Sequence, residues 1–249
     1  MARYQYSRAH VVPIYDCDLF CRLRPSAMLR YIQTVAGEHL DTLGLTYQRL
    51  YDEGFVFVVA GTALKIHRAP IAGEHILIST APFIGRGANM LRETVLQAED
   101  GALLAECQTN WALIDPHTNR LLRTSCFPYT LPMLGGEWVP FFDPRRIHIH
   151  LMEEPDGSVE RIVRLSDLDQ NLHMNNTVYA DILTDCFGDA YINSGGMDTL
   201  FLRYHLQAKL HDCLTLEYGY GDQLYVVSAH RGEKNCFEGA FSLKPLETV

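Results

Sequence analysis

The sequence predicts an α+β protein built from two tandem copies of one domain, each an antiparallel sheet wrapped around a single helix. Three observations support this fold class. The two halves carry matching features in the same order. Each half reads as one helix followed by a four-stranded antiparallel run, whose apolar face has to be buried against the helix. Between the halves, residues 128–144 hold four of the eleven prolines and a Gly-Gly pair, which is typical of a linker.

The internal repeat is visible as matched segments at a slowly shrinking spacing. Residues 18–22, with the apolar positions that follow them, match residues 169–173 at an offset of 151 without a gap. Residues 63–67 match residues 201–205 at an offset of 138. The drop from 151 to 138 indicates thirteen extra residues in the first copy, around Leu45 to Phe55. Features in matched order, at an offset that shrinks steadily along the chain, are what two diverged copies of one domain produce.

The first half contains signals for one helix and five strands. Val11 to Tyr15 reads as a strand, and Pro25 opens a helix that runs to about Leu43, because apolar residues recur there at helical spacing. Four β-rich runs follow, at residues 56–66, 76–82, 89–97 and 103–114, and a hairpin turn at residues 98–101 joins the last two.

The second half repeats this order. A strand at residues 161–165 precedes a helix from about Thr177 to Tyr191. Strands are then expected near residues 199–206, 213–220, 223–230 and 236–245. The domain limits that follow are residues 1–127, a linker at 128–147, and residues 148–249. Each domain is then near the usual size of roughly 100 to 150 residues.

Composition and charge narrow the class of protein. Of the 249 residues, 47% are hydrophobic and 20% charged, as in ordinary globular proteins, and no apolar run approaches the length needed to span a membrane. The net charge of −9 argues against nucleic-acid binding. Seven cysteines without a repeating spacing, and an N-terminus without a signal-peptide core, predict a cytoplasmic protein. The two copies could pair within one chain as a pseudo-dimer, so both a monomer and a homodimer are consistent with the sequence.

Residues 164–179 contain most of the side chains that are candidates for catalysis. Asp169, Asn171 and His173 stand at alternate positions, and in an extended or gently bent segment alternate side chains point the same way. We therefore expect a carboxylate, an amide and an imidazole on one side of the backbone. Polar turns rich in Asp and Asn also precede many helices without any catalytic role, and the spacing leaves that alternative open.

The helix after this block adds a second chemical feature. Asn175 or Asn176 is a suitable N-cap for a helix that begins near Thr177. The start of a helix offers unpaired N–H groups and a partial positive charge, which suit a developing oxyanion. The block therefore predicts an acid–base group beside an oxyanion site.

The first copy has lost most of this set. Asp18, Phe20 and Arg22 occupy its matching positions, so the carboxylate remains while the amide and the titratable base are gone. We therefore expect chemistry in the second copy, and a structural or binding role for the first.

The segment Ser166-Asp-Leu-Asp-Gln-Asn-Leu-His-Met-Asn-Asn-Thr-Val-Tyr179 resembles the signature of the fatty acyl-ACP thioesterases of plants and bacteria. The similarity extends to Glu74, the hairpin after Asn89 and the strand end at residues 111–115. The resemblance implies two tandem hotdog domains, an N-terminal one that binds the acyl chain and a C-terminal one that is catalytic. It also implies hydrolysis of the thioester that joins a fatty acyl chain to the phosphopantetheine of acyl carrier protein (ACP), which terminates fatty acid synthesis.

The resemblance carries the family's acidic, amide and imidazole positions onto Asp169, Asn171 and His173. A fourth position, usually Glu, aligns with Gln207, which can orient a water but cannot take its proton. The position of a cysteine considered as nucleophile in the plant enzymes is Ala208, which excludes that mechanism at this site.

Two mechanisms remain open. In the first, His173 is the base, Asp169 orients or charge-stabilises it, Asn171 positions the water or carbonyl, and the N–H groups of Met174 and Asn175 stabilise the oxyanion. In the second, Asp169 attacks the carbonyl and forms an anhydride.

Neither mechanism needs a metal or an organic cofactor. His148 and His150 have a spacing also found in zinc sites, but no cysteine or acidic ligand set accompanies them, so an ordinary strand is expected there.

Other functions use the same fold. The substrate could instead be an acyl-CoA or an aromatic-CoA, because only the contacts with the carrier differ. A non-catalytic acyl-binding protein is a second alternative, which the change to Gln207 keeps open. Dehydratases also use hotdog repeats, but their His-x-x-x-Gly-x-x-x-x-Pro pattern does not occur in this sequence.

Overall fold

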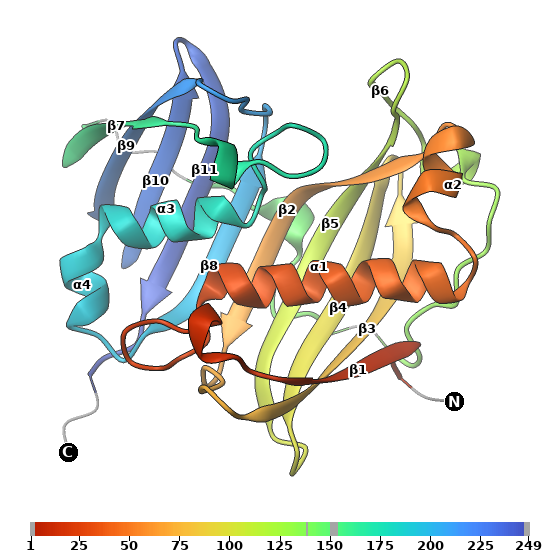
Figure 1. Cartoon of the computed structure of the whole chain (residues 1–249), viewed down its shortest axis with the longest axis horizontal. Helices are drawn as coiled ribbons and strands as arrows, with labels where there is room; N and C mark the ends of the chain where they lie inside the picture. The colour runs from red at the N-terminus through yellow and green to blue at the C-terminus, as the bar shows by residue number, and fades with distance from the viewer. Residues whose placement is uncertain (1–2, 138, 150–153, 247–249) are drawn as a thin grey trace. The chain divides into compact units, whose positions relative to one another are not determined.

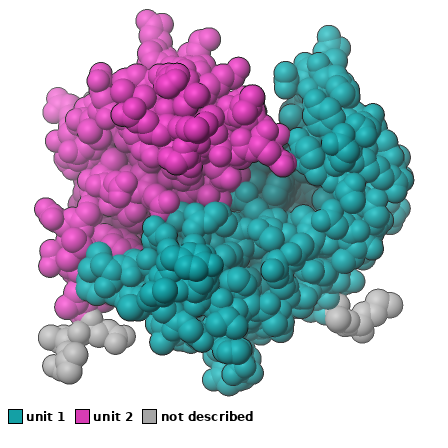
Figure 2. Space-filling model, viewed as in Figure 1, with its two compact units in different colours: residues 1–145 teal, residues 146–249 magenta. Residues whose placement is uncertain are grey.

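The chain divides into two compact units, residues 1–145 and 146–249 (Figure 2). The computed structural model describes residues 3–137, 139–149 and 154–246. Each unit holds an antiparallel sheet with a helix laid across one face (Figure 1), and the predicted hotdog architecture is confirmed. Among the described residues, no helix has the length and hydropathy that crossing a membrane would require.

The sheet of unit 1 (residues 1–145) has five main strands, all paired antiparallel. In spatial order they are β1 (Tyr6–Val11), β3 (His75–Arg86), β4 (Asn89–Ala98), β5 (Leu103–Asp115) and β2 (Val56–Ile66), with the short β6 (Arg120–Leu121) paired to β5.

Helix α1 (Pro25–Thr42) packs on this sheet through the apolar stripe predicted from the sequence. Proline suits the first position of a helix because its fixed φ is already helical and its missing N–H would have no partner there. The helix ends before Gly44, whose φ of 73° is a left-handed conformation that stops helices. The buried stripe consists of Met28, Leu29, Ile32, Val35 and Ala36.

The thirteen extra residues of the first copy include a separate helix of six residues. Helix α2 (Tyr47–Asp52) lies inside the predicted insertion, and the Thr46 hydroxyl caps its start. Two leucines of this region join a buried apolar cluster. Its members are Leu45, Leu50, Leu113, Phe127 and Leu131.

Unit 2 (residues 146–249) repeats the arrangement. Its strands, in spatial order, are β8 (Met197–Tyr204), β11 (Lys234–Leu243), β10 (Leu224–Arg231), β9 (Cys213–Gly221) and β7 (Gly157–Ile162), and its helices are α3 (Val178–Cys186) and α4 (Gly188–Ile192).

The prediction of one continuous helix from Thr177 to Tyr191 is wrong at Phe187, where the structure divides it into α3 and α4. The chain leaves helical geometry at Phe187, where φ is −128° and ψ is 36°. The Phe187 ring packs edge-on against the rings of Tyr218, Tyr225 and Phe241. The contacts of this half-buried ring outweigh continuing the helix, and Gly188, a poor helix former, follows.

The first strand of each copy lies earlier than predicted. The structure has β1 at Tyr6–Val11 rather than residues 11–15, and β7 at Gly157–Ile162 rather than 161–165. Both are mostly exposed edge strands, so their sequences carry little apolar alternation. Each is followed by a 3-10 turn, η1 (Ile14–Asp16) or η4 (Leu165–Asp167), and two further turns are η2 (Thr124–Cys126) and η3 (Pro144–Arg146).

Candidate active site

The block that contains Asp169, Asn171 and His173 is a tight loop, not the extended segment that we expected. The Asp169 N–H donates to the His173 carbonyl at 2.9 Å, and the Leu172 N–H donates to the Asp169 carbonyl at 3.0 Å. The Asn171 N–H donates to Asp169 Oδ1 at 2.8 Å. Leu172 has a φ of 61°, so the chain reverses there. The loop therefore brings the backbones of Asp169 and His173 together by closure, and not by strand alternation.

The loop is attached to the segment that follows β8. His173 forms an isolated antiparallel bridge with Lys209, and the Met174 N–H donates to the Ala208 carbonyl at 2.8 Å. Gln207 precedes this contact, beyond the end of β8 rather than on a strand, and its side chain is exposed. The fourth predicted residue is therefore in the segment that pairs with the loop.

The predicted oxyanion donors are already occupied. The Met174 N–H donates to Ala208, and the Asn175 N–H donates to the Asp167 carbonyl at 2.8 Å. These two bonds anchor the C-terminal side of the loop, so neither N–H is open to a substrate oxygen in this structure. The helix start itself was predicted correctly, since α3 begins at Val178. The two N–H groups are engaged because the Ala208 and Asp167 carbonyls accept from them, and the spacing of the block gave no sign of those acceptors.

Asn175 has a different role from a simple helix cap. Its Oδ1 accepts hydrogen bonds from the Thr177 N–H at 2.9 Å and from the Thr177 hydroxyl at 2.8 Å. This is an Asx turn directly before α3, which fixes the approach of the chain to the helix.

His173 is half-buried, and its pKa is lowered from the ordinary value of histidine. Burial disfavours the charged imidazolium, and the nearby Lys209 cation lowers the pKa further, while Asp169 opposes both. The imidazole is therefore neutral at pH 7 and can accept a proton.

Sequence reasoning did not identify Asp167, which holds this loop in place. Its carboxylate forms a two-point ion pair with Arg161, each bond 3.0 Å long, and accepts the Arg164 N–H at 2.8 Å. Burial alone would raise the pKa of Asp167, but the Arg161 pair and the Arg164 N–H leave it below its usual value. The signal in the sequence was Arg161, a cation three residues before the block that could pair with a carboxylate inside it.

The first copy of the loop has the same backbone geometry. The Asp18 N–H donates to the Arg22 carbonyl at 2.7 Å, the Cys21 N–H donates to the Asp18 carbonyl at 3.0 Å, and Cys21 has a φ of 60°. The Phe20 N–H reaches Asp18 Oδ1 at 2.9 Å. The predicted repeat thus extends to individual hydrogen bonds.

The side chains of the first copy make it unsuited to acid–base chemistry. Arg22 Nε donates to Asp18 Oδ2 at 2.9 Å, and the carboxylate side chain is only 6% exposed. A guanidinium stays protonated and cannot act as a base. The carboxylate kept from the common ancestor is therefore held in an ion pair inside its own loop.

A second matched pair of side chains accompanies each copy. His67 Nε2 lies 2.9 Å from Glu106 Oε1, and His205 Nε2 lies 3.3 Å from Glu238 Oε1. The two histidines are matched at the offset of 138 and the two glutamates at an offset of 132, but a pairing between histidine and glutamate could not be read from spacing alone. Because it occurs in both copies, we assign it to the fold rather than to catalysis.

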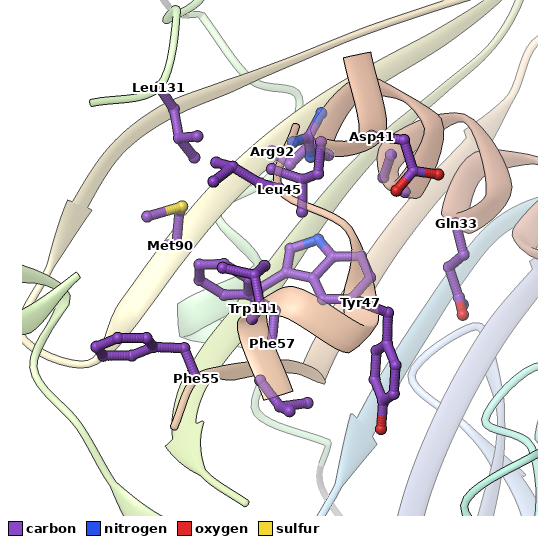
Figure 3. A pocket seen from close by; sticks show the side chains of 15 residues that line it. Gln33, Asp41, Leu45, Tyr47, Phe55, Phe57, Met90, Arg92, Trp111 and Leu131 are labelled. Atoms are coloured by element: carbon purple, nitrogen blue, oxygen red, sulfur yellow. The ribbon is translucent and has the colours of Figure 1, made fainter. Parts of the chain in front are cut away.

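Unit 1 contains a cavity of about 220 Å³ between its helices and its sheet (Figure 3). Its walls come from α1, α2, β2, β4 and β5, and most of them are apolar. Four side chains with polar groups, Gln33, Asp41, Tyr47 and Arg92, interrupt this apolar lining. The largest apolar lining residues are Leu40, Leu45, Leu50, Phe55, Phe57, Met90, Trp111 and Leu131.

In the part of the chain that the structure describes, no three His, Cys, Asp or Glu side chains gather as a metal site would require. Of the two histidines considered above, His148 lies in an irregular segment rather than the predicted strand, and His150 lies outside the described residues.

Two family models match this chain. The model of the acyl-ACP thioesterase N-terminal domain matches residues 3–125, and that of the C-terminal domain matches residues 153–243. A chloroplastic dodecanoyl-[acyl-carrier-protein] hydrolase of Cinnamomum camphora is 20% identical over 203 residues, which are 76% of this chain and 52% of that protein. The chain thus spans about half the length of this curated relative.

Solved structures with the same fold cover nearly the whole chain. An acyl-ACP thioesterase from Bacteroides thetaiotaomicron has a TM-score of 0.83 at 17% identity, over 96% of this chain and 97% of that one. The 12:0-ACP thioesterase from Umbellularia californica has a TM-score of 0.83 at 16% identity, over 97% of each chain. At these identities the likeness establishes the fold.

Proposed function

This chain belongs to the acyl-ACP thioesterase family, and from that premise we propose that it hydrolyses fatty acyl-ACP to free fatty acid and ends fatty acid synthesis. One observation carries the proposal: the same loop occurs twice, and only the second copy has a neutral, half-buried imidazole, His173, near a carboxylate, Asp169. The partner that follows from this activity is ACP bearing an acyl-phosphopantetheine.

In the proposed mechanism His173 takes a proton from a water molecule as the water oxygen attacks the thioester carbonyl. The resulting imidazolium then returns the proton to the departing phosphopantetheine sulfur. Asp169 stabilises the imidazolium, and Asn171 positions the water or the carbonyl. Gln207 can hydrogen-bond the water but cannot deprotonate it. Direct attack by Asp169 is the alternative. The carboxylate would form a mixed anhydride as the C–S bond breaks and the phosphopantetheine thiolate leaves; water would then hydrolyse the anhydride, and a proton released in that step would go to the thiolate.

We assign different tasks to the two domains. Residues 148–249 supply the chemistry, and residues 1–127 bind the acyl chain, with residues 128–147 as the connection. The apolar cavity of unit 1 supports the binding role, because a hydrocarbon chain is stabilised by leaving water for such a surface. A cytoplasmic location and the choice between monomer and homodimer stay predictions.

A non-catalytic acyl-binding function is the second candidate. Two observations favour it: Gln207 replaces the usual carboxylate, and the Met174 and Asn175 N–H groups are engaged in backbone hydrogen bonds. Under this alternative the cavity would still bind acyl chains, but no thioester would be cleaved.

Hydrolysis of matched acyl-ACP and acyl-CoA series, C8 to C18, distinguishes these functions. We expect turnover of the ACP esters with a preference for one chain length. Turnover of CoA esters alone would identify an acyl-CoA or aromatic-CoA thioesterase instead. Binding without turnover of either series would establish the acyl-binding alternative.

Replacing Gln207 with glutamate is expected to raise kcat by about tenfold or more, because a carboxylate can share the proton of the attacking water. The measurement is kcat on the best acyl-ACP. Gln223→Glu makes the same change at an exposed turn of unit 2 and should leave kcat unchanged. An unchanged kcat in Gln207→Glu would show that residue 207 does not contact the water.

A further inference from the structure

The cavity of unit 1 has a buried cation in its wall. Arg92, on β4, is 5% exposed and lines the cavity (Figure 3). Its Nη1 lies 3.2 Å from His39 Nδ1 and donates to the Thr80 hydroxyl at 3.2 Å. Among the described residues, no carboxylate forms an ion pair with this guanidinium, although Asp41 also lines the cavity.

An unpaired buried cation is rare, because removing a charge from water is costly unless an opposite charge or several acceptors replace the water. Burial lowers the pKa of Arg92 to about 10, so the side chain is still protonated at neutral pH. The neighbouring His39 cannot compensate the charge, since burial and the Arg92 cation lower its pKa to about 4 and leave it neutral. The positive charge of the cavity wall is therefore not balanced by its protein neighbours.

A second donor lies on the same face of the sheet. The β4–β5 register places Trp111 opposite Met90, two residues from Arg92, so Trp111 and Arg92 point to the same side. Both side chains line the cavity. The Trp111 Nε1 atom is buried and has no hydrogen-bond partner among the described residues. An indole N–H and a guanidinium can only donate, so both would be satisfied by an oxygen acceptor in the cavity.

We propose that Arg92 and Trp111 recognise an oxygen atom carried on the acyl chain, so that the preferred substrate is an oxygenated acyl-ACP rather than one with a plain hydrocarbon chain. The apolar remainder of the lining suits the methylene groups of such a chain. A hydroxyl, a keto group or a terminal carboxylate would each supply the missing acceptor, and a carboxylate would also neutralise the Arg92 charge. This substrate class rests on the thioesterase function proposed above.

The test compares kcat/KM for ACP esters of one chain length that are unsubstituted, hydroxylated, keto-substituted or terminated by a carboxylate, with the position of the oxygen varied. We expect the best oxygenated ester to exceed the unsubstituted one by at least about tenfold, which is the usual gain from a hydrogen bond to a charged donor. The ester with the highest kcat/KM shows whether a hydroxyl, a keto group or a terminal carboxylate is recognised.

Substitutions at Arg92 and Trp111 test whether these two side chains cause the preference for oxygenated esters. Arg92→Met is expected to abolish the preference, whereas Arg92→Lys and Trp111→Phe should each retain part of it. Arg120→Met, on the exposed strand β6, is the matched control and should keep the wild-type preference. If Arg92→Met does not fold, the wild-type series and Trp111→Phe still decide the question.

The proposal is overturned if the unsubstituted ester is hydrolysed as well as or better than every oxygenated one, a result that leaves the thioesterase function standing. If no ester is hydrolysed at all, the proposed function fails, and calorimetry with non-hydrolysable acyl-amide analogues of the same chains tests the cavity alone. Tighter binding of an oxygenated amide would then support recognition by Arg92, and equal binding would overturn it.

Discussion

Replacing His173 with alanine is expected to lower kcat/KM on acyl-ACP by about 10²- to 10⁴-fold, the range attributed to a general base. Asp169 remains in the variant, but its proposed role is to stabilise the His173 imidazolium. Without that imidazolium it cannot replace the lost base. His173 is half-buried, so its loss should not unfold the loop, whose closing bonds are made by the backbone. Steady-state kinetics and a thermal unfolding scan of each protein provide the measurement.

The pH dependence of the wild-type enzyme gives an independent signature of the same group. Because the His173 pKa is lowered, the imidazole is neutral at and above neutral pH, and kcat/KM should be flat there. As the pH falls through that pKa, protonation removes the base and kcat/KM should decrease about tenfold per pH unit. The pH profile of His173→Ala should lack this decrease in kcat/KM at low pH.

His75→Ala provides a matched control, because His75 is a histidine of β3 whose side chain is 63% exposed. It should retain wild-type kinetics. Activity in His173→Ala above about a tenth of the wild-type value would exclude His173 as the base. Attack by Asp169 would then become the favoured mechanism.

Replacing Phe237 with alanine is expected to destabilise the protein by about 3 to 5 kcal/mol, the usual cost of removing a buried aromatic ring. Phe237 is fully buried on β11. Its ring stacks on the ring of Tyr179 of α3, with the two ring centroids 4.4 Å apart. The ring of Tyr204 lies tilted against it, with centroids 5.9 Å apart. The ring packs directly on Gly239, where an added Cβ would lie 2.6 Å from it, and a glycine has no side chain that could move into the space that the ring leaves.

The same substitution should also weaken the support of the candidate site. The Tyr204 hydroxyl donates to the Asn176 carbonyl at 3.0 Å, between the loop and α3. If the loss of Phe237 lets Tyr204 move, this hydrogen bond is weakened and the backbone beside the loop is held less firmly. Urea denaturation measures the stability change, and amide exchange measures the opening near Asn176. Phe20→Ala, at a ring that is 43% exposed, should cost less than about 1 kcal/mol. Equal costs at the two positions would contradict this account of the core.

The architecture could be predicted because its signals are local or repeated along the chain. The apolar stripe of α1 has helical spacing, and the offsets between the copies locate the insertion that became α2. The edge strands β1 and β7 were predicted a few residues too late in the chain, because exposed strands need no apolar alternation that would mark their ends. The break at Phe187 could not be predicted because its ring packs against aromatic rings from three different strands, and the local sequence does not show those contacts.

The sequence by itself determined the repeat, the order of elements and which copy retains a titratable base, since each is a matter of residue identity at a counted spacing. Only the tertiary structure decided how those residues are used. The Met174 N–H is occupied because Ala208, far along the chain, brings its carbonyl to it. Arg92 becomes an unbalanced cation because the packing of unit 1 removes it from water without supplying a carboxylate. Hydrogen-bond occupancy and burial depend on partners from distant segments, and spacing within one segment cannot reveal them.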